Sequence, residues 1–143
     1  MAERVILRQN DSFEVEVLAS SPHEEDSQAL QRVEHLHNLT PYGMLLTSLG
    51  SCTAILLHSY AQNRGLKLHE VELRLSYARD FKQDCDNCEG EDQYDERIDL
   101  EIKLSGELSE QERERLFLVS RQCPIHKILK GGIRVHTLWA QDQ

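Results

Sequence analysis

The chain has 143 residues, with 16 Lys and Arg against 25 Asp and Glu, which gives a formal net charge of −9. This length fits one domain of ordinary size, so we expect a single domain over residues 1–143. The negative charge argues against nucleic-acid and membrane partners, and no uninterrupted apolar run has the length of a membrane span. The first residues lack a signal-peptide core, so we expect a cytoplasmic protein.

Alternating apolar and polar residues predict two strands within residues 3–18. Asn10-Asp11 interrupts the alternation, which is typical of the turn in a β-hairpin. The segment that follows is polar and acidic. There we expect an exposed loop, with a weak strand or helical turn from Leu30 to Leu36.

The clearest helix begins at Thr40-Pro41, because Thr is a good N-cap and Pro suits the first helical turn. Arg64-Gly65 supplies a basic last turn and a C-terminal glycine. Apolar residues recur between these ends at helical spacing, as Leu45, Leu49, Cys52 and Leu56. The helix is apolar on more than one side, so we expect it at the centre of the fold. A monomer of this length does not easily cover so many apolar sides, so we also expect a homodimer.

Two longer alternating segments predict strands over residues 68–82 and 95–106. The segment between them is polar and acidic and contains Cys85 and Cys88. A capping box from Ser109 to Glu112 then opens a further helix.

Cys123-Pro124 interrupts that helix, and a short helix is expected from Ile125 to Lys130. Alternation returns from Ile133 to Trp139 and predicts a final strand. The expected order is β-β-loop-α-β-β-α-α-β. Long helices mixed with hairpin-like strands indicate an α+β fold, with the long central helix against an antiparallel sheet.

The four cysteines are the best candidates for chemistry, since thiols in a reducing compartment are more often reactive or metal-bound than paired in structural disulfides. Cys52 lies mid-helix among apolar residues, as a packed core cysteine does. Cys123 lies at a helix break, where the helix dipole and a cation such as His126 or Lys127 can lower the thiol pKa. An incidental thiol at a break fits that position equally well.

Cys85-x-x-Cys88 has a spacing found in metal and redox sites, and Cys123 with His126 could complete a Cys₃His zinc set. Neither half has the glycine-containing knuckles of a zinc ribbon. Acidic neighbours raise the pKa of the two loop thiols and disfavour a redox thiolate. We therefore interpret the segment as an exposed acidic loop and expect neither a metal site nor a cofactor.

Three segments together resemble the OsmC/Ohr family, the osmotically inducible and organic-hydroperoxide-resistance proteins. These segments are Thr40-Pro41-Tyr42, Leu49-Gly50-Ser51-Cys52-Thr53 and Ser120-Arg121-Gln122-Cys123-Pro124-Ile125-His126. The similarity extends over most of the chain and includes the strand order. The Cys-x-x-Cys loop is similar to that of one subgroup of the family.

The resemblance implies an OsmC-like fold, an intertwined homodimer and a cysteine-based antioxidant peroxidase of the stress response that reduces organic hydroperoxides. In the family the helix cysteine is peroxidatic, which maps to Cys52, and the Cys-Pro cysteine is resolving, which maps to Cys123. The sulfenic acid formed on the first condenses with the second to a disulfide, which an external dithiol reduces. An apolar pocket around Cys52 favours organic hydroperoxides over hydrogen peroxide.

The chain departs from the family near the first thiol. The family's supporting Glu follows the Pro that opens the helix, where this chain has Tyr42-Gly43, and Arg32 is the nearest candidate by spacing for the supporting Arg. Two alternatives stay open. One is a zinc-binding module built on the Cys₃His set, and the other is a family member that binds a small apolar or electrophilic ligand without turnover.

Overall fold

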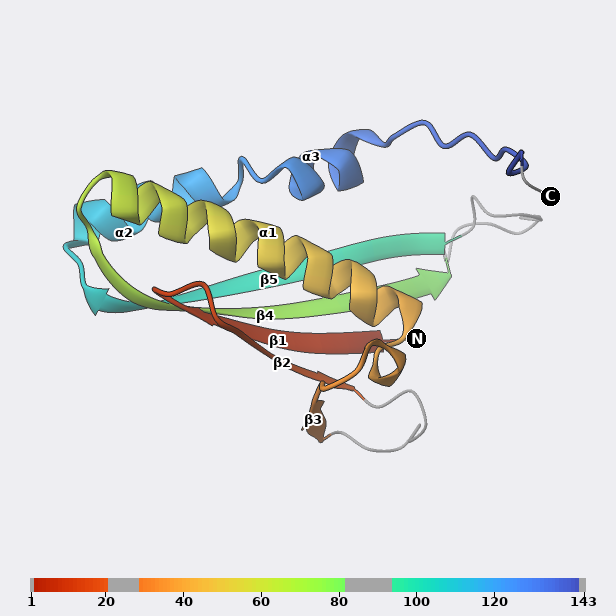
Figure 1. Cartoon of the computed structure of the whole chain (residues 1–143), viewed down its shortest axis with the longest axis horizontal. Helices are drawn as coiled ribbons and strands as arrows, with labels where there is room; N and C mark the ends of the chain where they lie inside the picture. Colours follow the sequence, from red (N-terminus) through yellow and green to blue (C-terminus); the bar gives the residue numbers. More distant parts are fainter. Residues whose placement is uncertain (1, 21–28, 82–93, 142–143) are drawn as a thin grey trace.

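The structure is a computed structural model that describes residues 2–20, 29–81 and 94–141. Its elements in chain order are β1 (Ala2–Asn10), β2 (Val15–Ser20), β3 (Leu30–Arg32), η1 (Leu36–Asn38), α1 (Pro41–Asn63), β4 (Lys67–Phe81), β5 (Tyr94–Glu107), α2 (Glu110–Ser120) and α3 (Pro124–Gly131). One sheet contains the five strands in the order β3-β2-β1-β4-β5, with antiparallel neighbours. Figure 1 shows α1 lying across one face of this sheet, with α2 and α3 on the same side. The expected α+β class is confirmed.

The hairpin expected over residues 3–18 is confirmed, with its turn where Asn10 interrupts the alternation. The Asn10 side-chain oxygen accepts hydrogen bonds from the backbone N–H groups of Ser12 at 3.0 Å and Glu14 at 2.9 Å. This is how Asn favours turns: its side chain satisfies backbone donors that no strand can reach. The weak element expected from Leu30 to Leu36 is a short strand, β3, followed by the 3₁₀ turn η1.

Helix α1 begins where the sequence predicts, because the Thr40 hydroxyl accepts a hydrogen bond from the Gly43 N–H at 2.9 Å. Gly50 lets this helix approach the sheet closely. A Cβ atom added there would lie 3.0 Å from Leu75 Cδ1 and 3.5 Å from Leu7 Cδ1. Since those two leucines are buried in the sheet, a larger residue at Gly50 would push the helix away.

Helix α1 also has the length and composition of a membrane span, with a mean hydropathy of 1.3 over its most apolar window. Serine and threonine residues interrupt the apolar sequence of this helix, which is why the sequence contains no uninterrupted apolar run of that length. In the fold, 44% of that most apolar stretch is buried against the rest of the chain, and apolar side chains such as Met44 and Ile55 are exposed on the outer face of the helix.

The core lies between the sheet and the helices. Alternation along β1 and β4 turns one set of apolar side chains toward α1. Leu116 and Val119 of α2, on the same side of the sheet as α1, complete the core. The buried residues from the sheet and α1 include Val5, Leu7, Val71, Leu73, Leu75, Leu46, Leu49 and Leu57.

The opposite face of the sheet is polar. Glu72 on β4 is only 7% exposed, because Arg8 Nε at 2.7 Å and Arg74 at 2.8 Å cover its carboxylate. The hydrogen bond from Arg8, aided by Arg74, lowers the pKa of Glu72, so the carboxylate stays charged. This face therefore needs no further layer of protein over it.

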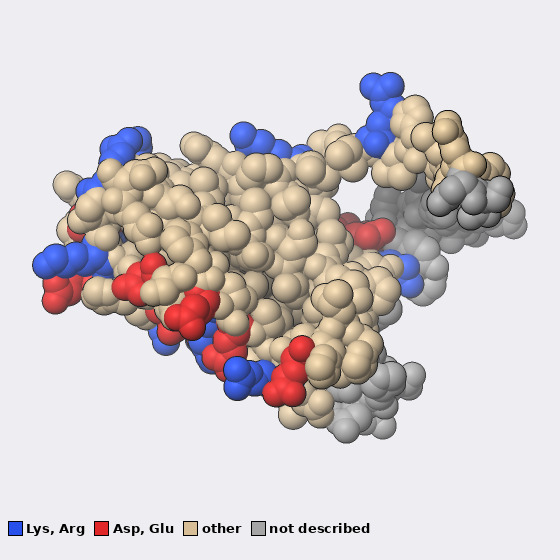
Figure 2. All heavy atoms as spheres, in the orientation of Figure 1, with Lys and Arg blue, Asp and Glu red and all other residues tan. Residues whose placement is uncertain are grey.

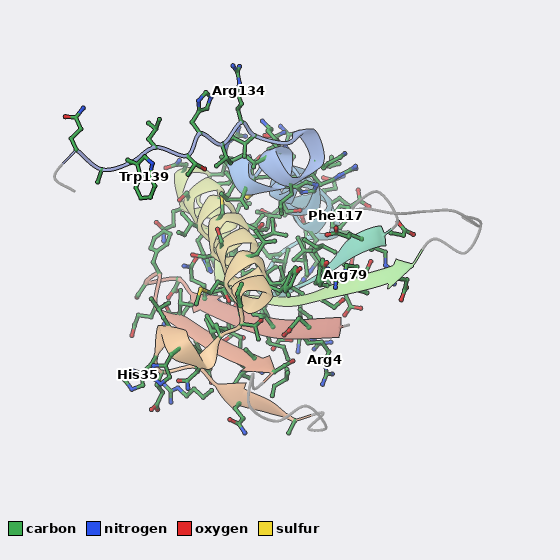
Figure 3. The ribbon with its side chains drawn as sticks, turned by 90° about the vertical axis from the view of Figure 1, so that its right-hand side faces the viewer. Arg4, His35, Arg79, Phe117, Arg134 and Trp139 are labelled. Atoms are coloured by element: carbon green, nitrogen blue, oxygen red, sulfur yellow. The ribbon has the colours of Figure 1, made fainter. Side chains whose placement is uncertain are left out.

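The final strand expected from Ile133 to Trp139 is not formed: in the described part of the chain, no strand follows α3. Ile133, Val135 and Trp139 are 68%, 81% and 89% exposed. Figure 3 shows Arg134 and Trp139 on an extended segment that stands away from the helices. Alternation gives the side-chain period of a strand, but a strand also needs a neighbouring backbone, and this segment has none in the described part of its own chain.

Candidate active site

The structure brings Cys52 and Cys123 together, although 70 residues separate them in the sequence. A hydrogen bond joins their side chains. Cys52 lies mid-helix on α1 and is half-buried, whereas Cys123 is fully buried. Both are free thiols.

The break between α2 and α3 positions the second thiol. Helix α2 ends at Ser120, and Pro124 starts α3, since a proline suits the first position of a helix and cannot continue the preceding one. Cys123 is thereby the N-cap of α3, and its carbonyl accepts a hydrogen bond from the Lys127 N–H at 3.1 Å. The first turn of α3 points toward Cys52 as a result.

The electrostatics of Cys52 combine opposing influences. Burial raises the pKa of the thiol most, and the hydrogen bond with Cys123 raises it further. The backbone N–H of Ile125, in the first turn of α3, hydrogen-bonds to the sulfur and lowers the pKa. The net result is a raised pKa. Among the described residues, no arginine or carboxylate is part of this balance.

An apolar pocket of about 350 Å³ lies between α1, the β4–β5 strands and α3, and its lining includes neighbours of the two thiols but neither Cys52 nor Cys123. Leu49, one turn before Cys52, lines it, and so does His126 of α3. The other apolar lining residues are Leu45, Ile98, Leu100 and Leu129. The volume lies within the range of pockets for small organic ligands.

One end of this pocket is polar. The rings of Tyr42 and Tyr77 stack at 4.5 Å, and the Tyr77 hydroxyl donates a hydrogen bond to Glu96 Oε2 at 3.1 Å. Burial and this carboxylate raise the pKa of Tyr77 to about 12, so the hydroxyl stays protonated. Arg97 and Lys130 also line the pocket.

The family resemblance implies a supporting carboxylate just after the proline that opens the helix. Here Tyr42 occupies that position, and a carboxylate reaches the pocket from β5 instead, as Glu96. Arg32, the candidate for the supporting arginine, lies exposed on β3, at the opposite edge of the sheet from β5.

The sequence did not point to Tyr77 or Glu96. Alternation along β4 places Tyr77 on the helix-facing side, but its partner depends on the β4–β5 register, in which Arg79 faces Glu96. That register cannot be read from either strand alone.

Cys85 and Cys88 lie outside the described residues. The other two residues of the suggested zinc set are Cys123, which contacts Cys52, and His126, which lies half-buried at the apolar pocket. Among residues 2–20, 29–81 and 94–141, no three His, Cys, Asp or Glu side chains gather as they would around a metal ion.

Comparison with known proteins agrees with this fold. A family model described as "OsmC-like protein" matches residues 34–137. The crystal structure of an OsmC-like hydroperoxide resistance protein from Jannaschia sp. CCS1 is 13% identical, with a TM-score of 0.63 over 99% of this chain and 96% of that chain. No curated protein gives a significant match. Because the family model spans most of the sequence, from the segment before α1 to the exposed tail, the chain belongs to the OsmC-like protein family.

Proposed function

We propose that this protein is a cysteine-based peroxidase that reduces organic hydroperoxides through Cys52 and Cys123. The observation that carries the proposal is the contact between these two free thiols, a half-buried one in the middle of α1 and a fully buried one at the start of α3. The similarity to a protein described as hydroperoxide resistance protein supports the same chemistry.

The reaction assigns a different role to each thiol. The Cys52 thiolate attacks one peroxide oxygen, the O–O bond breaks, and the substrate leaves as an alcohol after taking up a proton. Cys52 is then a sulfenic acid. The Cys123 thiol condenses with it, which forms the Cys52–Cys123 disulfide and releases water. An external dithiol returns both cysteines to thiols and is itself oxidised to a disulfide.

Cys52 is the better candidate for the first attack. It keeps part of its surface exposed, whereas Cys123 is 0% exposed and no peroxide can reach it directly. The Ile125 N–H stabilises negative charge on the Cys52 sulfur. Cys123 needs only to reach its neighbour, which it already contacts.

The apolar pocket favours an organic substrate. Leu45, Leu49 and Leu129 can bury an alkyl chain in this pocket, and each buried methylene contributes about 0.8 kcal/mol to binding. Leu49 lies one helical turn from Cys52 on α1. Hydrogen peroxide gains nothing from this surface. The pocket therefore supports discrimination by the apolar part of the substrate.

We further propose that the working form is a homodimer in the cytoplasm. Apolar side chains of the tail after α3 and of the outer face of α1 are exposed, including Val135 at 81%, Trp139 at 89% and Ile55 at 45%. A second copy can supply the missing backbone neighbour for the tail and cover these side chains.

Substitution of single cysteines tests the peroxidase. Cys52→Ser should reduce the consumption of cumene hydroperoxide to the uncatalysed background, because the proposed attacking thiol is removed. Cys123→Ser should react once and stall as a sulfenic acid on Cys52 that a dimedone probe traps. Cys85→Ser serves as the matched control and should keep full turnover. Equal turnover in all three variants would exclude the mechanism, whereas a wild-type protein that consumes no hydroperoxide would favour a member of the family that only binds ligands.

A further inference from the structure

We propose that a groove on the far side of the thiol pair binds the anionic group of a small thiol reductant. This proposal rests on the proposed peroxidase function and names the chemistry of its second substrate. The groove is open, with a volume of about 900 Å³, and lies between the second half of α1, α2 and α3.

The charge of the groove is the first observation. Its basic lining residues are Arg64, Arg115, Arg121, His126, Lys127 and Lys130. Of the residues that the structure describes, no carboxylate lines it, in a chain whose net charge is −9. In Figure 2, Lys and Arg stand along the edge formed by α2 and α3, whereas most visible Asp and Glu atoms gather over the sheet. Such a cluster concentrates anions locally.

The position of the groove is the second observation. Leu56 lies one helical turn after Cys52, and Val119, at the end of α2, lies four residues before Cys123; both line the groove. His126 lines both this groove and the apolar pocket. The thiol pair therefore has an apolar pocket on one side and a cationic groove on the other, which suits two substrates of different polarity.

Part of the groove is held in place by internal contacts. Arg115 Nε donates to the Tyr60 hydroxyl at 3.1 Å, and the Arg64 guanidinium lies 4.9 Å from the centre of the Tyr60 ring. Arg121 and Lys127 are exposed beside them. Fixed cations lose little side-chain entropy when an anion binds.

The reductive step is a thiol–disulfide exchange. A reductant thiolate attacks the Cys52 sulfur of the Cys52–Cys123 disulfide, a mixed disulfide forms, and Cys123 leaves as a thiolate at the N-terminus of α3. A second reductant thiolate attacks the mixed disulfide and releases Cys52. Two reductant thiols lose two electrons to form one disulfide, and the two protein thiols gain those electrons and two protons.

Matched thiols of different charge test the groove. The disulfide is prepared with diamide, so that the measurement does not depend on peroxidase turnover. Its reduction is then followed with mercaptoethanesulfonate, which is anionic, and with mercaptoethanol, which is neutral. In Arg121→Gln/Lys127→Gln protein, the rate constant with the anionic thiol should fall about tenfold, and the rate with the neutral thiol should change less than twofold.

Lys103→Gln is the control, because it removes a lysine charge in the same way at an exposed position on β5 outside the groove. It should leave both rates unchanged. The loss with the anionic thiol should shrink in high salt, because salt screens exposed charges. The groove assignment is wrong if the double variant slows both thiols equally or slows neither. Failure of diamide to form the disulfide would instead count against the peroxidase mechanism itself.

Discussion

Cys52 is held in its protonated form by its neighbours, and this sets the conditions under which it can react. Burial and Cys123 both favour the neutral thiol, and only the Ile125 N–H opposes them. A thiol is a poor nucleophile until it ionises, so the supply of thiolate would limit the first step of the proposed reaction. This differs from cysteine enzymes in which a nearby cation lowers the thiol pKa.

The oxidation of Cys52 should therefore depend steeply on pH. Because the pKa is raised, the thiolate fraction should increase about tenfold per pH unit between about pH 6 and pH 8. Single-turnover oxidation of the Cys123→Ser variant, with the sulfenic acid trapped by dimedone, measures this directly. A rate that levels off below pH 7 would show that a cation outside the described residues lowers the pKa.

At the residue scale, the sequence singled out the two thiols that the structure brings together but not the groups around them. Cys52 and Cys123 stand in recognisable local segments, one in an apolar helix and one before a proline. Tyr77 and Glu96 belong to no such segment. Their contact arises from the pairing of two strands, which is a property of the sheet and not of either strand's sequence.

Among the elements, α1 governs the site because it holds Cys52 against the sheet and α3. Its ends were predictable, since Thr40, Pro41 and Gly65 are local signals that act within one helical turn. Its distance from the sheet was not predictable, because that distance depends on Gly50 meeting Leu75 and Leu7.

Gly50→Val should destabilise the protein by about 1 to 3 kcal/mol, since the added branches have no room between the helix and the two leucines. Ser48→Val, at an exposed position on the same helix, adds the same side chain without this clash and should cost less than about 1 kcal/mol. Urea unfolding measures both free energies. Equal losses in the two variants would show that helix propensity, and not the close approach to the sheet, determines the effect.

For the whole molecule, the exposed tail after α3 shows the limit of prediction from one chain. Its alternation from Ile133 to Trp139 correctly indicates the side-chain period of a strand. Pairing is a separate condition, and a single copy does not meet it. The expectation of a second copy comes from the apolar sides of α1 and from the family resemblance, and not from the alternation of the tail.

Removal of residues 133–143 should convert the proposed dimer to a monomer, because the tail is the segment with unmet pairing and the largest exposed apolar side chains. Light scattering at micromolar concentration measures the mass. Ile133→Ser/Val135→Ser should weaken the dimer in the same direction, and Arg134→Ser/His136→Ser, on the alternate positions, should leave it intact. A full-length chain that is monomeric, or a truncated chain that stays dimeric, would contradict the role of the tail.

The strand order β3-β2-β1-β4-β5 also has a consequence for how the chain folds. Within the first hairpin, Gln9 pairs with Val15, which closes a short loop. Between the two halves of the sheet, Val5 pairs with Leu75 across the whole of α1. Loop-closure entropy makes that second contact about 2 kcal/mol more costly than the first. The central ladder thus depends on α1 packing onto both halves, and the helix that carries Cys52 is also the element that joins the two hairpins into one sheet.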